Sequence, residues 1–322
     1  MQELAGYTLF LEKEIEKLDF PSSPSNLYDP LRYFMTLGGK RMRPILTLLG
    51  AELFGEKREN ALPAALAVEV FHNFTLIHDD IMDEAPKRRN QQTVHTKWNQ
   101  NIAILSGDVL FVKGFQLLAK QKSEHLSSLL DVFNTTAIEV CEGQQLDMDF
   151  ETRQNVSIPE YIEMIRLKTS VLLGCALEMG AIVANAEKQD RRFLYDFGQH
   201  VGIAFQIQDD ILDLYADPEK FGKQVGGDVI SNKKTLLNLK AFDMANSTQK
   251  LILEQLALEQ DAVLKVQKTR EVYDLIGVRS ACEVHMQEHY SHAMESLSKV
   301  NLHEKTKLPL IALADFLMQR DN

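Results

Sequence analysis

The sequence has few cysteines, no long uninterrupted apolar run and no excess of positive charge. Its 322 residues include only three cysteines, an odd number, which argues against a disulfide framework and predicts a reduced, cytoplasmic protein. No run approaches the roughly 18 apolar residues of a membrane span, and the first twenty residues lack the apolar core of a signal peptide. The formal net charge of −11 disfavours non-specific nucleic-acid binding, which needs clustered cations.

Strand signals are also scarce. Alternating β-branched runs joined by Asn-Gly or Asp-Gly turns are missing, whereas long segments rich in Ala, Leu, Glu, Gln, Lys and Met favour helices. Hydrophobic residues make up 45% of the chain, which is enough for a globular core. The sequence therefore predicts an all-α fold of about twelve helices. Because the connections are short and the composition is even, we expect a single domain over residues 1–322.

Two segments of similar sequence end in Asp-Asp-x-x-Asp, at residues 74–83 and 204–213. Their aspartates are Asp79, Asp80 and Asp83 in the first segment and Asp209, Asp210 and Asp213 in the second. The outer two of each motif are four residues apart, so a helix places them on one face, one turn apart. Like charges at this spacing cost a few tenths of a kcal/mol, and more near the negative end of the helix dipole. A solvated acidic face is the simpler interpretation of one copy, but two copies favour bound cations.

Carboxylates with no cysteine or histidine cluster nearby are hard oxygen ligands, which suit Mg²⁺. Mg²⁺ keeps several waters and usually takes one or two carboxylates together with substrate phosphates. We therefore expect the two acidic clusters to face one another and to hold a polyphosphate between them.

Basic residues accompany both acidic motifs. Residues 38–44, Gly-Gly-Lys-Arg-Met-Arg-Pro, place three cations in a glycine turn, and the proline fits the first turn of a helix whose N–H groups can face an anion. Arg88 and Arg89 follow the first motif, and arginine forks bind phosphate oxygens bidentately. Lys223 and Lys233 follow the second motif. This arrangement favours a magnesium–diphosphate clamp over a metal store.

These motifs belong to a longer ordered set, which covers roughly residues 30 to 240. The set comprises Gly38 to Pro44, His78 to Asp83 with Arg88-Arg89, Thr93-Val94-His95, Ser106-Gly107-Asp108, Lys168-Thr169, Phe205 to Asp213, Gly222-Lys223, Gly227-Asp228 and Asn232 to Thr235. In order and spacing it resembles the trans-isoprenyl diphosphate synthases (polyprenyl synthetase family) of the short-chain type, similar to geranylgeranyl and farnesyl diphosphate synthases. The resemblance implies an all-helical bundle of the isoprenoid synthase type around a deep central cavity, usually as a homodimer.

The implied reaction is Mg²⁺-dependent head-to-tail prenyl transfer. An allylic diphosphate ionises at C1, the double bond of isopentenyl diphosphate attacks the cation, and the released diphosphate takes the proton. Three Mg²⁺ ions are expected to neutralise the departing diphosphate. By resemblance, Asp79 and Asp83 hold two of them and Asp209 holds the third, with Asp80 and Asp213 in support.

The resemblance also implies the substrate-binding residues. Those beside the allylic diphosphate and the developing cation are Lys168, Thr169 and Gln206, and the carbonyl and hydroxyl dipoles there would stabilise positive charge. Those expected to bind the diphosphate group of the allylic substrate are Arg88, Lys223 and Lys233. Those that hold isopentenyl diphosphate are Lys40, Arg43, His72 and Arg89. His72 lies about two helical turns before Asp79 and so shares its face.

The sequence departs from the family pattern at three points, none of which removes a ligand. Asn90-Gln91-Gln92 replaces Gly-x-Pro after the arginines, Trp98-Asn99 replaces Trp-Gly, and Thr235-Leu236-Leu237 replaces Thr-Leu-Pro. The shape of the loop after the first motif is therefore open.

Product length is argued from the helix that carries Asp79. The product should grow towards the N-terminus of this helix, and each isoprene unit needs about one turn, or roughly 5.4 Å. Phe74 and Phe71 are bulky and lie three apart on neighbouring positions of one face, whereas Thr75 is small. We expect Phe74 to close the cavity and favour a C20 product ahead of C15, with a long chain of C30 or more as the alternative. The other interpretation is that both phenylalanines are ordinary core residues.

Three rival functions are weaker. His285-Met286-Gln287-Glu288-His289 fits the inverted zinc-protease pattern, but the segment is polar and shows no third ligand. A class I terpene cyclase would have the fold and one aspartate motif, and here the second motif, Lys40 and Arg43 argue against it. A non-catalytic synthase subunit would tend to lack the aspartates.

Overall fold

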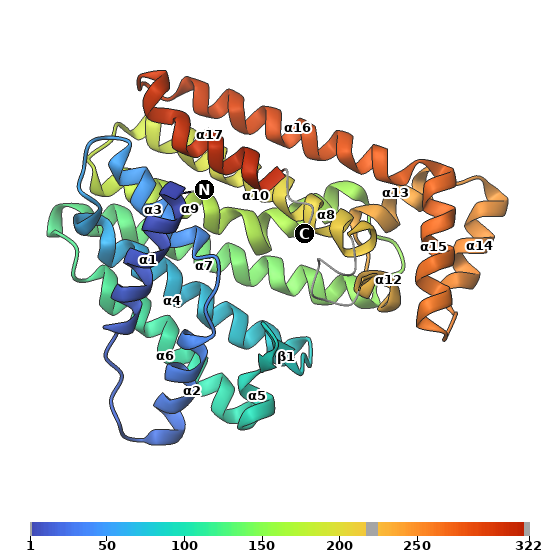
Figure 1. Ribbon diagram of the computed structural model, residues 1–322, viewed down its shortest axis with the longest axis horizontal. Coiled ribbons are helices and arrows are strands. Elements are labelled where there is room, and N and C mark those ends of the chain that lie inside the picture. Colours follow the sequence, from blue (N-terminus) through green and yellow to red (C-terminus); the bar gives the residue numbers. More distant parts are fainter. Residues whose placement is uncertain (1, 217–224, 319–322) are drawn as a thin grey trace. The chain divides into compact units, whose positions relative to one another are not determined.

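The computed structural model describes residues 2–216 and 225–318, with side chains from residue 5 onward. The described residues are almost entirely helical, which confirms the all-α prediction (Figure 1). They fall into two compact units: Met1–Thr135 with Cys175–Arg192, and Thr136–Gly174 with Phe193–Asn322. Each boundary lies inside a helix, so no linker separates the units in sequence. The single domain and the deep central cavity stay predictions.

The first unit is built around one long helix. Its elements are α1 (Gln2–Glu16), α2 (Ser25–Thr36), α3 (Met42–Glu52), α4 (Arg58–Met82), β1 (Lys87–Arg88), β2 (Gln91–Gln92), α5 (Val94–Lys97) and α6 (Gln100–Leu118), with the start of α7 (Ser123–Thr152), the end of α9 (Val171–Val183) and the start of α10 (Lys188–Tyr215). Helix α4 packs on α3 and α6, and its alanines and valines are almost fully buried. Two glycines let α3 and α9 touch along their backbones, because a Cβ on Gly180 would lie 2.1 Å from the Thr47 carbonyl oxygen.

A short antiparallel ribbon follows the first acidic motif, where the sequence predicted no strand. Strands β1 and β2 pair Lys87 with Gln92 and Arg88 with Gln91. Both loop residues between them, Arg89 and Asn90, have positive φ angles of 52° and 62°. This is the backbone geometry of a two-residue hairpin turn, and asparagine adopts it more readily than most residues. The departure from the family pattern at Asn90 is thus accommodated by a tight turn.

Helix α6 is the one described helix long and apolar enough to span a membrane by length and composition, and 39% of that stretch is buried within the protein. A Cβ on Gly114 of α6 would lie 3.6 Å from the Ala67 carbonyl oxygen and 3.8 Å from Val70 Cγ2, both on α4. Core helices of soluble proteins have the same composition, so α6 is interpreted as part of the core of the first unit.

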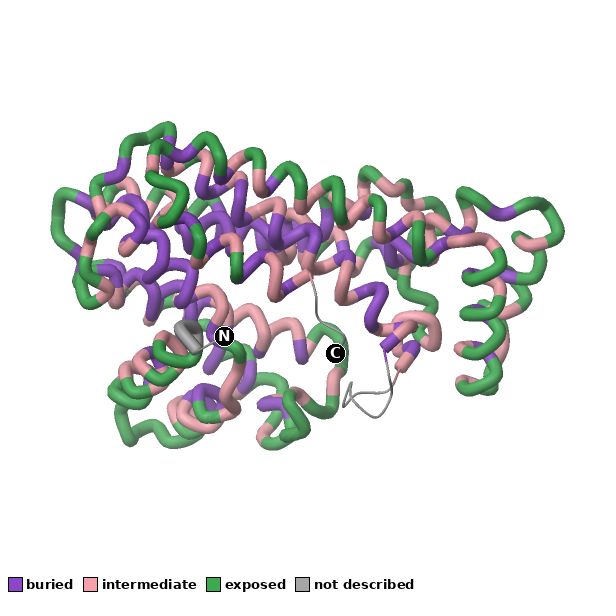
Figure 2. Tube along the Cα trace, turned by 45° about the horizontal axis from the view of Figure 1, so that its top comes forward, coloured by how far each residue is buried: buried purple, intermediate pink, exposed green. Residues whose placement is uncertain are grey.

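The second unit contains the second acidic motif. Its elements are the rest of α7, α8 (Ile158–Ile165), the π-helix η1 (Arg166–Ser170), the start of α9, most of α10, α12 (Gly227–Ile230), α13 (Leu236–Met244), α14 (Ser247–Ala257), α15 (Ala262–Ile276), α16 (Val278–Lys299) and α17 (Glu304–Met318). A core of Ile203, Ile207 and Ile211 from α10 packs with Val278 and Cys282 from α16. The α14–α15 pair is mostly exposed (Figure 2).

Candidate active site

The first acidic motif lies at the C-terminal end of α4, as predicted. Asp79 and Asp80 fall in the last turn, and Asp83 caps the helix with its N–H bonded to the Asp79 carbonyl oxygen at 2.9 Å. The β-ribbon brings Arg88 back to the motif. Its Nε donates to Asp80 Oδ1 at 2.8 Å and its Nη2 to Asp79 Oδ2 at 3.2 Å. The structure thus places Arg88 beside the first acidic motif, where it bridges two of the aspartates.

Asp80 differs from its neighbours because it is buried. Its residue exposure is 1%, and burial raises the pKa of its carboxyl to about 6, against the lowering effect of Arg88. Its Oδ2 atom accepts no hydrogen bond from any described residue. A buried carboxylate oxygen that can still accept a hydrogen bond or bind a cation suits a position that supports a metal ion.

The basic turn before α3 is held in a left-handed conformation. Gly38, Gly39 and Arg41 have φ angles of 76°, 142° and 50°, and α3 begins at Met42. A Cβ on Gly39 would lie 2.8 Å from Arg89 Nη2, and side chains rarely adopt the φ of Gly39, so glycine suits this turn beside the Arg89 guanidinium. The predicted neighbours Lys40 and Arg89 therefore come from two segments that meet, with Lys40 exposed.

The two arginines of this turn, Arg41 and Arg43, have different partners. Arg41 is 5% exposed and forms a buried ion pair with Glu69, so its role is structural. Arg43 Nη1 instead lies 3.0 Å from His72 Nε2, and burial lowers the pKa of the Arg43 guanidinium to about 10. Sequence analysis missed Glu69. The available signal was an acidic residue three positions before His72 in an otherwise apolar run of α4.

His72 is neutral at physiological pH. Burial, followed by the charges of Arg43 and Arg89, holds the pKa of its imidazole well below the ordinary value. The structure therefore brings together Arg43, His72 and Arg89, three of the four residues predicted to bind isopentenyl diphosphate, closely enough to interact electrostatically.

The second acidic motif lies near the C-terminal end of α10 and repeats the pattern of the first. Its middle residue, Asp210, is 5% exposed. It accepts hydrogen bonds from the Tyr161 hydroxyl, from Gln206 Nε2 at 3.3 Å and from the Leu236 N–H at 3.3 Å. Burial and then the charge of Asp228 raise the pKa of this carboxyl to about 7. In both motifs the middle aspartate is buried and the outer two lie nearer the surface.

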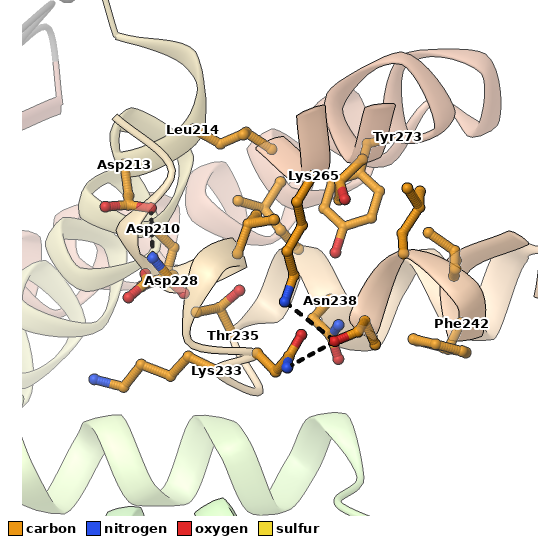
Figure 3. A pocket seen from close by; sticks show the side chains of 17 residues that line it. Asp210, Asp213, Leu214, Asp228, Lys233, Thr235, Asn238, Phe242, Lys265 and Tyr273 are labelled. Atoms are coloured by element: carbon orange, nitrogen blue, oxygen red, sulfur yellow. Dashed lines mark hydrogen bonds between the residues drawn. The ribbon is translucent and has the colours of Figure 1, made fainter. Parts of the chain in front are cut away.

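Asp213 contacts the start of α12. Its Oδ2 accepts the Asp228 N–H at 3.0 Å, as Figure 3 shows, and its carbonyl oxygen accepts the Gly226 N–H at 2.6 Å. Asp213 and Asp228 line one wall of a pocket that also includes Lys233 and the buried Lys265. Lys223, predicted to bind the allylic diphosphate, lies outside the described residues.

The predicted pair Lys168 and Thr169 lies on the π-helix η1. Two glycines allow this turn to touch its neighbours, because a Cβ on Gly143 of α7 would lie 2.2 Å from the Lys168 nitrogen and one on Gly202 of α10 would lie 2.7 Å from Ser170 Cα. Single π-turns inside α-helices are frequent at functional sites. The backbone of η1 is therefore fixed between α7 and α10.

The side chains on η1 meet the other predicted residues of this unit. Lys168 Nζ lies 2.6 Å from Asp147 Oδ2, and Lys233 Nζ lies 3.9 Å from the same oxygen. The Thr169 hydroxyl donates to Gln206 Oε1 at 3.4 Å. Sequence analysis missed Asp147, which anchors both lysines. Its signal was weak: an acidic residue one turn after Gly143 on α7.

Phe71 and Phe74 belong to an aromatic cluster with Phe111 and Phe115 of α6 and Phe133 of α7. Phe71 is 1% exposed, and its ring centroid lies 5.2 Å from that of Phe133 and 5.6 Å from that of Phe74. Phe74 is half-buried and stacks on Phe111 at 5.1 Å. Phe71 is thus a core residue, whereas Phe74 lies at the edge of the cluster. The predicted chain-length role of Phe71, Phe74 and Thr75 stays a prediction.

The inverted zinc-protease pattern is not assembled. His285 Nδ1 lies 3.3 Å from Glu288 Oε2, whereas His289 Nδ1 contacts His200 Nδ1 at 3.1 Å. The two histidines of the pattern therefore have different partners, which removes the basis for that rival.

Comparison with known proteins places these features in context. Residues 24–276 match the family model described as Polyprenyl synthetase. The geranylgeranyl diphosphate synthase of Methanosarcina mazei is 43% identical over 245 residues, which are 76% of each chain. The geranylfarnesyl diphosphate synthase of Natronomonas pharaonis is 40% identical over 247 residues, 71% of this chain and 72% of its own. A solved geranylgeranyl pyrophosphate synthase is 41% identical, covers 100% of this chain and 99% of its own, and has a TM-score of 0.93.

Proposed function

The chain belongs to the polyprenyl synthetase family of prenyltransferases, and we propose that it condenses isopentenyl diphosphate head-to-tail with an allylic diphosphate to give a short-chain, all-trans prenyl diphosphate. One observation carries this proposal. Two intact Asp-Asp-x-x-Asp motifs lie near the ends of largely buried helices, and each unit pairs cations with aspartates: Arg88 with Asp80 in the first, and Lys168 and Lys233 with Asp147 in the second.

The donor set fits magnesium. The motifs offer carboxylate oxygens, the ligands that Mg²⁺ prefers, and Asp80 Oδ2 has spare capacity. We propose that Asp79 and Asp83 hold two ions and Asp209 a third, with Asp80 and Asp213 in support. Bound magnesium would act as a Lewis acid that neutralises the diphosphate and so eases its departure.

The residues of η1 and α10 would serve the allylic substrate. Lys168 and Lys233 both pair with the same oxygen of Asp147, so their two ammonium groups are positioned to bind diphosphate oxygens. Gln206 is oriented by its hydrogen bond to Asp210, which turns Oε1 towards Thr169. A carbonyl dipole fixed in this way can stabilise positive charge that develops at C1 without reorganising during the reaction.

The cluster of Arg43, His72 and Arg89 in the first unit would hold isopentenyl diphosphate. Arg43 donates to His72 Nε2, so the neutral imidazole carries its proton on Nδ1 and can donate it in a hydrogen bond. Together with Arg89 and Lys40, this gives three cations and one neutral donor for a diphosphate group. No proton acceptor is needed in this cluster, because the released diphosphate can take the proton.

A C20 product is favoured, followed by C15, with a long-chain product as the alternative. The half-buried Phe74 ring lies one and a half turns before Asp79 and is backed by Phe111 and Phe71, so it can limit chain growth. The relatives named as geranylgeranyl and geranylfarnesyl diphosphate synthases support a product in the short range.

We further propose a cytoplasmic homodimer. Helix α6 exposes Leu105 and Val112 at 57% and 56%, seven residues apart and so on one face. Exposed apolar side chains on one helix face suit an interface with a second copy of the chain. Sedimentation or light scattering of the purified protein tests the dimer, and Leu105→Lys should shift it towards the monomer.

Product analysis tests the reaction. Purified protein is incubated with Mg²⁺, isopentenyl diphosphate and a C5, C10 or C15 allylic starter, and products are measured by mass spectrometry. We expect C20 prenyl diphosphate, complete loss of activity on chelation, and losses of at least about 100-fold for Asp79→Asn and Asp209→Asn. Asp243→Asn changes an exposed aspartate outside the motifs and should leave activity unchanged. Equal activity of both motif variants and the control would refute the proposal.

A further inference from the structure

Three histidines of the second unit come together away from the residues proposed for prenyl transfer. His200 lies on α10, and His289 and His292 lie on α16. The His200 ring centroid is 5.3 Å from that of His289 and 5.2 Å from that of His292. One ring nitrogen from each residue lies within 4.8 Å of the other two. Two helices thus direct three imidazoles at one point.

The spacing suits a small transition-metal ion. A zinc–imidazole bond is about 2.0–2.1 Å, so the nitrogens of a tetrahedral zinc site lie about 3.3 Å apart. The Nδ1 atoms of His200 and His289 are 3.1 Å apart, close to this value. His292 is exposed, so a small rotation can bring its nitrogen into range at little cost in packing.

The two less exposed rings are in the form that binds metals. Burial and the neighbouring His292 lower the pKa of His200, and burial together with His200 and His292 lowers the pKa of His289 to about 4. Both are therefore neutral at neutral pH, and neutral imidazole is the ligand form. The charges of Asp196 and Glu295 act in the opposite direction and raise the pKa of His200.

We propose that His200, His289 and His292 bind a divalent transition-metal ion of the zinc type, with water completing the site, and that this ion fastens α10 to α16. Imidazole selects zinc, copper or nickel, whereas Mg²⁺ prefers oxygen ligands. The site is therefore chemically distinct from the aspartate motifs. His200 lies nine residues, or about 13.5 Å of helix, before Asp209, so the ion would stiffen the helix that carries the second motif.

His285 provides a matched control. It lies on the same helix and forms the inverted zinc-protease pattern with His289, but its Nδ1 faces Glu288. A site built on the sequence pattern would need His285. The site proposed from the structure needs His292 instead.

Zinc binding to the full-length, metal-free protein tests the proposal. Zn²⁺ is titrated in competition with a coloured chelator, in excess Mg²⁺ so that the aspartates are occupied, and Co²⁺ absorption reports the coordination. We expect one Zn²⁺ per chain in the wild type and in His285→Ala, with affinity lowered more than about 10-fold in His289→Ala and His292→Ala. Because a ligand that binds only the folded state raises its stability, Zn²⁺ should raise the Tm of the first two proteins more than that of the other two.

Two outcomes would overturn the inference. One is equal zinc affinity in the wild type and both cluster variants, and the other is a loss in His285→Ala as large as that in His289→Ala. Since His292 is exposed, its variant should fold normally, and circular dichroism verifies this. Prenyl transfer is measured separately, so failure of the zinc site leaves the proposed reaction standing.

Discussion

Replacing Phe74 with alanine should lengthen the product by about one isoprene unit. The ring lies five residues, or about 7.5 Å along α4, before Asp79. A phenyl ring and a five-carbon isoprene unit have similar lengths, each close to one helical turn. Removing the ring therefore opens about one unit of depth, and the product distribution should move from C20 to C25.

The same change should cost only moderate stability. Phe74 loses its stacking on Phe111 at 5.1 Å, its edge contact with His78 at 4.7 Å and its contact with Phe71 at 5.6 Å. Aromatic pairs contribute roughly 0.5–1.5 kcal/mol each, so three of them give a loss of about 1.5–4.5 kcal/mol. Phe71→Ala should cost more, about 3–5 kcal/mol, because Phe71 is 1% exposed.

Comparing the single and double variants distinguishes a residue that closes the cavity from one that only packs in the core. Products are measured by mass spectrometry with a C15 starter, and unfolding is followed with denaturant. Phe71→Ala alone should keep the wild-type product, because Phe74 still closes the path, whereas the double variant should extend the chain beyond Phe74→Ala. An unchanged product in Phe74→Ala, measured on protein shown to be folded, refutes the reasoning.

Three further predictions concern the charged residues. Glu69→Gln should lower the free energy of unfolding by about 3–5 kcal/mol, since it leaves Arg41 buried without its anion; chemical denaturation measures this. Lys168→Met should lower kcat/KM for the allylic substrate about 100-fold or more, and unchanged kinetics would remove Lys168 from the site. The pKa of His72 is lowered in the folded state, so the unfolded state binds more protons below pH 6.5 and stability falls there; His72→Gln should flatten this fall in pH-dependent denaturation.

Sequence analysis predicted the helical fold and the positions of both motifs because their signals are local. Four-residue spacing places Asp79 and Asp83 together in any helix, and the glycine turn at Gly38 depends only on backbone freedom. Partners that come from distant segments carry no such signal. Glu69 and Asp147 each pair with a cation supplied by another element, and nothing in a single sequence specifies which cation that is.

The distribution of these partners explains how a chain of net charge −11 can bind diphosphates. Each cluster of cations includes an acidic group that offsets the repulsion between the cations in the free protein. Glu69 does so for Arg41 and Arg43, and Asp147 does so for Lys168 and Lys233. In the first motif the relation is reversed, because Arg88 offsets the repulsion between Asp79 and Asp80. A magnesium-bound diphosphate brings both charges at once, so it can replace the ion pairs that Arg88, Lys168 and Lys233 form with aspartates. Either component alone would leave one set of charges uncompensated, which predicts that diphosphate and Mg²⁺ bind cooperatively.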